Sequence, residues 1–204
     1  MRYLILFFIG IPFIASAQLP SKGMFSLGAR TTYNSFSHDG NGLGAGAHFR
    51  IQLTDRINTE WFFDYISVGD EDIKSNYAHI GWSVMFYPLK DQSYPKRIQP
   101  YVSAGHCFDY NKKFAVRNPE NSMDRWGSAV QGGVGTHINL TERFDISISS
   151  LYMIHLTPEI GSHIHTVDGT PVVEFGDHSH SDLEGHLLTT ISLNYKIGQL
   201  WGRK

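Results

Sequence analysis

The feature of this sequence that most constrains its fold is a period of two in hydrophobicity, which recurs in eight segments. In FSLGARTTYN, residues 25–34, one face holds Phe25, Leu27 and Tyr33, whereas Arg30 lies on the other face among polar and small residues. Successive side chains of a β-strand point to opposite faces, so this alternation predicts a strand with one apolar and one polar side. Strands are therefore the expected unit of this fold.

The length of the alternating segments separates two kinds of all-β protein. Each segment is about nine to twelve residues long, which is the length that a tilted strand needs to cross the hydrocarbon layer of a membrane. Strands of soluble sandwiches are typically about five or six residues long. The pattern predicts an all-β fold, an eight-stranded antiparallel up-and-down transmembrane β-barrel. Its strands are expected at residues 25–34, 43–53, 57–65, 77–87, 101–110, 129–140, 144–156 and 187–197.

The connections between these segments mostly alternate between short and long. Residues 54–56 and 141–143 are three-residue turns, whereas residues 111–124 and 157–185 form long connections on the opposite side. Transmembrane barrels have short periplasmic turns and longer extracellular loops. We therefore expect the two long connections to lie outside the cell.

The polar faces of the strands carry six charged residues into an interior that eight strands leave only wide enough for side chains. A turn centred on Asp55 places Arg50 directly opposite Glu60, and the closing hairpin brings Asp145 and Lys196 to the same end. We expect these charges to neutralise one another, because unpaired buried charges are costly. A conducting pore is the alternative, favoured by small residues in GAGAHFR and GGVGTH. The six charged residues are Arg30, Arg50, Glu60, Asp64, Asp145 and Lys196.

The first residues are typical of a secretory signal. Met1 and Arg2 precede a short apolar run, and the small residues Ala15 and Ala17 follow it. This arrangement predicts a cleaved signal peptide at residues 1–17 and a single barrel domain at residues 18–204.

Composition argues against two other classes. The formal net charge is −2, and acids and bases are interspersed, so the basic stripe that nucleic acid requires is missing and no nucleic-acid partner is expected. Cys107 is the single cysteine, so an internal disulfide framework is excluded, and we interpret it as a small residue packed in a strand.

The connection at residues 157–185 is rich in histidine. In an extended backbone, a His-x-His pair places two imidazoles on one face, so His163 with His165, and His178 with His180, are candidate ligands for Zn²⁺ or another divalent transition metal. If Asp168-Gly169 forms a two-residue hairpin turn, His165 pairs with Val172 and the second histidine pair falls out of register with the first. The alternative interpretation is an exposed polar loop that titrates near neutral pH.

The whole mature chain resembles the eight-stranded outer-membrane β-barrel proteins, the group that includes the OmpA transmembrane domain and OmpX. The resemblance rests on the eight alternating segments, on the glycine-rich GLGAGAHF and QGGVGTHINL, on QPYVSAGHCF and on TTISLNYKIG. It implies a monomer in the outer membrane of a Gram-negative bacterium, in contact with outer-membrane lipids and lipopolysaccharide, with its loops extracellular. It fixes no catalytic residue and no cofactor.

The expected function is therefore a structural or surface-interaction role without enzymatic activity, in which the loops meet an extracellular ligand or surface partner. Two alternatives stay open, namely a metal-binding surface barrel that uses residues 162–186 and a lipid A-modifying hydrolase. A hydrolase needs a histidine-activated serine at the lipid-facing rim, and His155 is the nearest candidate for that histidine.

Overall fold

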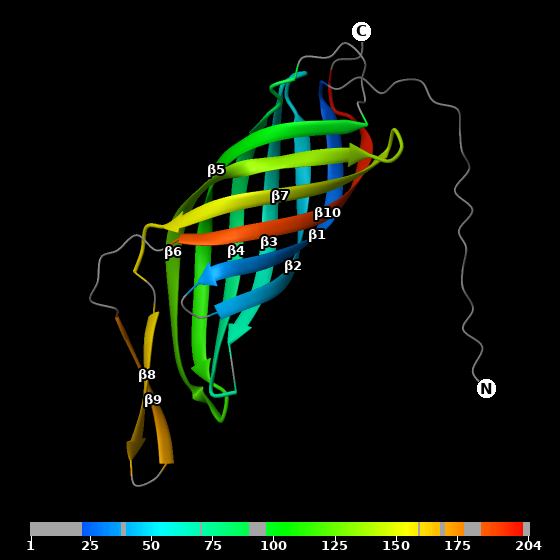
Figure 1. The fold of residues 1–204 in the computed structure, drawn as a ribbon. Helices are drawn as coiled ribbons and strands as arrows, with labels where there is room; N and C mark the ends of the chain where they lie inside the picture. Colours follow the sequence, from blue (N-terminus) through cyan, green and yellow to red (C-terminus); the bar gives the residue numbers. More distant parts are fainter. Residues whose placement is uncertain are drawn as a thin grey trace, which may run out of the picture.

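The residues that the structure describes form ten strands, and eight of these strands close into one barrel (Figure 1). The computed structural model describes residues 22–37, 40–69, 71–89, 97–158, 160–167, 170–177 and 185–201, so the predicted signal peptide at residues 1–17 lies outside the described residues. The described residues hold no helix long and apolar enough to span a bilayer. The strands are β1 (Met24–Ser37), β2 (Gly40–Gln52), β3 (Ile57–Gly69), β4 (Ile73–Phe86), β5 (Ile98–Ala115), β6 (Asn118–Asn139), β7 (Phe144–His155), β8 (Ile160–Val167), β9 (Thr170–Asp177) and β10 (Gly185–Gln199).

The barrel has the predicted up-and-down topology, with each strand antiparallel to both neighbours. The order around the barrel is β1, β10, β7, β6, β5, β4, β3 and β2, so each of the eight predicted segments is a barrel strand. The remaining two strands, β8 and β9, form a separate two-stranded sheet in the connection between β7 and β10. The fold prediction is confirmed.

The register of the strands shows a strong stagger. A path along directly paired residues leaves β1 at Phe25 and returns to β1 at Ser35, ten residues further along the strand. A stagger of this size in eight strands corresponds to a strand tilt of about 40° from the barrel axis, as in other barrels. The intermediate partners are Ile51, Thr59, Val84, Ala104, Gly132, Tyr152 and Leu187.

The outer surface of the barrel is the apolar side of each strand. Leu193 on β10 is 51% exposed, whereas its neighbour Ser192 is 5% exposed and faces the lumen. On the outside, aromatic rings follow one another across adjacent strands: Phe49 stacks on Trp61 with centroids 6.1 Å apart, and Trp61 contacts Trp82 at 6.5 Å. An outward apolar surface that carries aromatic rings is typical of transmembrane barrels.

The half of the lumen nearest the short turns is filled by the predicted charge network. Arg50 Nε donates to Glu60 Oε2 at 2.6 Å across the β2–β3 pair, as expected. Arg30 Nη1 reaches the other oxygen of Glu60 at 3.0 Å and its Nε lies 3.0 Å from Asp64 Oδ1. The six charged residues singled out in the sequence are all buried.

Asp145 completes this network on the far wall. Lys196 Nζ lies 3.7 Å from Asp145 Oδ2, and Arg50 Nη1 lies 3.4 Å from Asp145 Oδ1. His48 is hydrogen-bonded to Asn194 at 2.7 Å. Every charge named in this network therefore has a partner of opposite sign, which is the condition for burying it.

The glycines that suggested gaps for a pore are covered by larger side chains. A Cβ added at Gly135 would collide with the ring of Tyr101, and one added at Gly46 would collide with the carboxylate of Asp64. The small residues thus make room for lumen side chains. This packing removes the support that these glycines gave to a conducting pore.

The outer half of the lumen contains an apolar cluster. Phe62, Ile66, Cys107, Met153 and Leu188 belong to one buried cluster there. Cys107 is fully buried, with Sγ 3.8 Å from Met153 Sδ, as expected for a packed thiol.

The first prediction tests which face of β10 meets lipid. Leu193→Arg should lower the free energy of unfolding by about 2 to 4 kcal/mol, the cost of arginine on the lipid face near the membrane midplane. Urea unfolding in lipid vesicles measures this cost, with Asn118→Arg, at an exposed position in β6, as the control. An equal effect at the two positions would contradict the membrane-spanning assignment.

The second prediction concerns the ion pair of Arg50 and Glu60. Arg50→Met or Glu60→Met alone should cost several kcal/mol, because each change leaves buried charges without their full set of partners. The double variant should recover part of this loss, since it removes both charges together. A double-mutant cycle gives the coupling energy, and strictly additive losses would show that the two side chains do not interact.

Candidate functional site

At one end of the barrel, β5 and β6 extend beyond β7 and β10. This end carries the features that the barrel fold does not explain. The pairing of β6 with β7 stops at Ala129 and His155, whereas β6 stays paired with β5 as far as Asn118 and Ala115. In Figure 1, β5 and β6 accordingly extend past β7 and β10. We call residues 108–128, the outer parts of β5 and β6 with their turn, the outer extension.

The outer extension corrects one expectation. Residues 111–124 were expected as a loop, but the structure places Asn111 within the outer part of β5 and Asp124 within β6. Lys112 pairs with Asp124, and Tyr110 pairs with Trp126 with ring centroids 5.1 Å apart. Cross-strand charge and aromatic pairs of this kind stabilise a ladder even where no face is apolar throughout.

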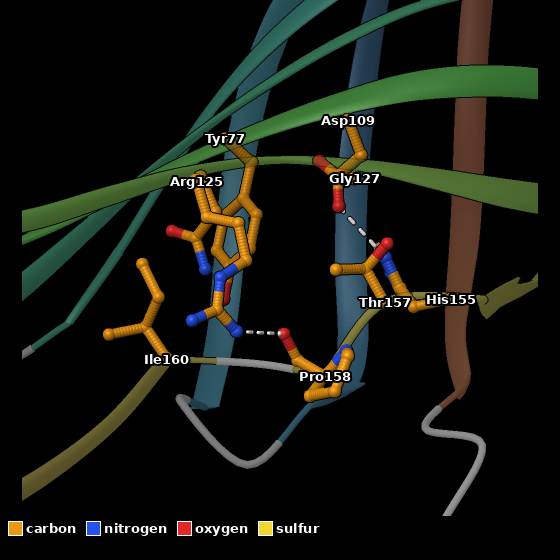
Figure 2. Close-up of a pocket in the computed structure, with 9 residues that line it drawn as sticks. Tyr77, Asp109, Arg125, Gly127, His155, Thr157, Pro158 and Ile160 are labelled. Carbon is orange, nitrogen blue, oxygen red and sulfur yellow. Dashed lines mark hydrogen bonds and ion pairs between the residues drawn. The ribbon is translucent and has the colours of Figure 1, made fainter. Parts of the chain in front are cut away.

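A pocket opens at the mouth of the barrel, inside the base of the outer extension (Figure 2). Arg125 of β6 lies over it and donates from Nη1 to the carbonyl of Pro158 at 2.9 Å. The connection after β7 is thereby tied to β6. The pocket is lined by Tyr77, Asp109, Asn111, Arg125, Gly127, His155, Thr157, Pro158 and Ile160.

The floor of this pocket contains a buried carboxylate between two imidazoles. Asp109 Oδ2 lies 2.8 Å from His155 Nδ1, and its Oδ1 lies 3.2 Å from His79 Nε2. The ring of His186 is 4.5 Å from that of His155, and its Nδ1 is 3.2 Å from Asn34 Nδ2. These side chains come from β4, β5, β7, β10 and β1. Their contacts therefore connect five strands across the lumen beneath the mouth.

The cluster of Asp109 with its neighbouring histidines could have been predicted only in part from the sequence. Alternation places His79, Asp109 and His155 on the lumen side, and the β4–β5 register puts His79 directly opposite Asp109. The contact between Asp109 and His155 joins β5 to β7, which are not neighbours in the sheet. Only the closure and stagger of the barrel bring those two residues together.

His155 does not occupy the position that a lipid hydrolase requires. Its side chain is 5% exposed and points into the lumen, where Asp109 holds it. A hydrolase acting on a membrane lipid needs its histidine at the lipid-facing rim. The geometry of His155 therefore fits a structural role at the mouth of the barrel.

The histidine-rich connection contains the hairpin that its Asp-Gly dipeptide predicts. His165 pairs with Val172 and Thr166 with Pro171, which is the expected register, and His163 lies opposite Glu174. His178 and His180 follow the end of β9 and lie outside the described residues. Among the side chains that the structure describes, no group of three or more His, Cys, Asp or Glu could hold a metal ion.

The β8–β9 hairpin contacts the outer extension. Asn121 Nδ2 donates to the carbonyl oxygen of Val173 at 2.7 Å, and a hollow lies between these two segments. Figure 1 shows β9 and β8 beside the far end of β6.

Comparison with known proteins finds likeness in structure only. No family model matches the sequence, and no curated protein is similar to it. A major outer membrane protein from Thermus thermophilus superposes with a TM-score of 0.62 at 10% identity, covering 85% of this chain and 98% of that chain. The fold is that of the small outer-membrane β-barrels.

Two eight-stranded barrels of known structure support the same fold assignment. Neisserial surface protein A gives a TM-score of 0.54 at 13% identity, covering 85% of this chain and 97% of that one. The attachment invasion locus protein Ail of Yersinia pestis gives 0.50 at 15% identity, covering 86% and 99%. The resemblance to small outer-membrane barrels is confirmed at the level of the fold.

Proposed function

We propose that this protein is a non-enzymatic outer-membrane β-barrel of a Gram-negative bacterium, with a structural or surface-interaction role. The observation that carries this proposal is the asymmetry of the two barrel ends. One end has short turns at residues 53–56 and 140–143, whereas the other bears the outer extension and the β8–β9 hairpin. A barrel with one elaborated end is suited to presenting that end to the cell exterior.

The environment of the barrel follows from the apolar outer face and the polar inner face of its strands. The exposed apolar outer face contacts outer-membrane lipids, and lipopolysaccharide is the lipid that surrounds the elaborated end. The closed barrel acts as a monomer, because closure pairs the strand edges along the barrel wall within one chain. The filled lumen supports a role at the surface over conduction, and the lumen position of His155 weakens the lipid A hydrolase alternative.

Orientation is the third prediction, and cysteine labelling in intact cells tests it. Glu120→Cys in the outer extension should react with a membrane-impermeant maleimide on whole cells, because the side chain is exposed at the elaborated end. Asp55→Cys in a short turn should react only after lysis. Cys107 is fully buried and serves as the internal blank.

Equal labelling of the two variants in whole cells, or the reverse order, would contradict the orientation. Gel mobility with and without boiling confirms that each variant is a folded barrel, since a folded barrel changes mobility on boiling.

As a second candidate function, we propose that the histidine-rich connection binds a divalent transition metal such as Zn²⁺ at the cell surface. One observation favours it: Glu174 lies directly opposite His163, and His165 lies two positions along β8. Residues two apart in a strand share a face, and a carboxylate with imidazoles suits zinc. His178 and His180 follow β9 in the sequence and form the second candidate pair.

The fourth prediction is a weak, pH-dependent affinity for Zn²⁺. Isothermal titration of the purified barrel should show binding at about pH 7.5 and almost none at about pH 5.5, because protonated imidazoles do not bind metal. Replacing His163, His165, His178 and His180 by Ala should abolish the signal. His106→Ala is the control, since His106 lies on the barrel wall, hydrogen-bonded to Ser128 at 2.8 Å.

Identical titrations of the wild type and the fourfold variant would show that these histidines are only polar residues of the connection.

A further inference from the structure

The connection that carries the β8–β9 hairpin begins and ends at two imidazoles in contact. His155 is the last residue of β7, and His186 is the second residue of β10. Their ring centroids are 4.5 Å apart, and both side chains are buried in the lumen. The strands on either side of the connection therefore meet through two groups that can each take up a proton. We call these histidines and their neighbours the mouth cluster, which consists of His79, Asp109, His155 and His186.

The hydrogen bonds of the two rings fit uncharged imidazoles. His155 Nδ1 lies 2.8 Å from Asp109 Oδ2 and donates to it, whereas its Nε2 is buried without a hydrogen-bond partner among the described residues (Figure 2). Asn34 donates from its side-chain nitrogen to His186 Nδ1 at 3.2 Å. A protonated imidazole carries a hydrogen on both nitrogens and cannot accept. Charging His155 would bury an N–H without an acceptor, and charging His186 would remove the acceptor that Asn34 uses.

A single carboxylate faces the imidazoles directly. Asp109 lies between His155 and His79, and His79 Nε2 is 3.2 Å from Asp109 Oδ1. Asp64 of β3 also interacts electrostatically with His79, but its Oδ1 lies 3.0 Å from Arg30 Nε, so its charge is already balanced. The mouth cluster therefore has three groups that can become positive and one that is negative.

The other titratable groups around the mouth add no negative charge at neutral pH. Arg125 of β6 lies over the mouth pocket, and Lys113 is buried on the lumen side of β5 beyond Asp109. Tyr77 of β4 and Cys107 of β5 are uncharged at neutral pH. Protons added to the imidazoles would therefore enter a region where, in the described part of the chain, positive groups already outnumber Asp109.

We propose that the mouth cluster closes this end of the barrel in a pH-dependent way. Uncharged imidazoles hold the ends of β7 and β10 together at neutral pH, and protonation below about pH 6 separates them. Repulsion between two charged rings acts directly on these strand ends, and the contact of Arg125 with Pro158 follows three residues after His155. Acid thus releases the base of the connection that carries the hairpin. The consequence at the cell surface rests on the proposed function, because this end must face the exterior.

Cys107 is a native reporter of this opening. It is the single cysteine of the chain, it is fully buried, and it lies two positions before Asp109 on the lumen face of β5. The apolar cluster that contains Cys107 lies beneath the mouth cluster. A small thiol reagent that enters from the mouth therefore reaches Cys107 only when the mouth cluster opens.

The probe is 4,4′-dithiodipyridine, a disulfide that reacts with thiols in acid as well as at neutral pH and releases a coloured thione. The rate for Cys107 in the purified barrel is divided by the rate for N-acetylcysteine at the same pH, which corrects for the pH dependence of the reagent. This ratio should rise about tenfold or more between about pH 7.5 and about pH 5.5. An opening that takes up one proton gains up to about tenfold for each pH unit.

Replacing one ring of the pair tests the cause of the rise. His186→Gln keeps a polar side chain opposite Asn34 but removes the repulsion between charged rings, so the ratio should rise less than about threefold over the same range. His155→Gln removes the other ring and should give the same loss. His106→Gln is the matched control, because His106 lies on the outer wall, hydrogen-bonded to Ser128, and its loss should leave the full rise. Gel mobility with and without boiling, at both pH values, confirms that each barrel is folded.

Three results would overturn the proposal. The first is an equal ratio at the two pH values in the wild type. The second is an equal rise in the wild type and in the folded glutamine variants of the pair. The third is loss of the folded gel band of the wild type at about pH 5.5, because acid would then unfold the whole barrel. These measurements use the purified barrel, whereas whole-cell labelling of Glu120→Cys decides the orientation, so the proposed function is tested separately.

Discussion

The buried contact between Arg50 and Glu60 is the constraint on which this barrel depends. Eight strands enclose a narrow interior, and a charge placed there is tolerated only with a partner. Arg50 meets this condition on several walls at once: it contacts Glu60 on β3, Asp145 and Ser147 on β7 and Ser192 on β10. One guanidinium therefore links strands far apart around the barrel, which is how a polar interior acts as a packed core.

The other end of the lumen achieves closure by different chemistry. Apolar side chains such as Ile66, Met153 and Leu188 fill it, and Asp109 with its two imidazoles closes the space above them. Each half of the barrel is thus stabilised by contacts that lie inside the closed sheet. The β8–β9 hairpin and the part of the outer extension beyond Asp109 take little part in those contacts, so their sequences can change without loss of the barrel.

The local sequence pattern was sufficient to predict contacts between strands that are neighbours in the sheet. The turn centred on Asp55 places Arg50 opposite Glu60, and the Asp-Gly dipeptide at residues 168–169 predicts the observed pairing of His165 with Val172. Contacts across the lumen were out of reach, because Arg30 meets Glu60 and Asp109 meets His155 only after the staggered sheet closes. The outer ends of β5 and β6 were missed for another reason. Polar and charged residues occupy both of their faces, so hydrophobic alternation no longer marks the strand.

Those same charges explain how an open edge can persist on a protein surface. Strand edges invite pairing with further copies of the same chain, and proteins oppose this with charged residues along the edge. Two copies meeting edge to edge along β6 would bring Glu120 and Asp124 of one chain close to those of the other, and like charges directly opposite are destabilising. The acidic residues along this edge therefore disfavour self-association, consistent with a monomer.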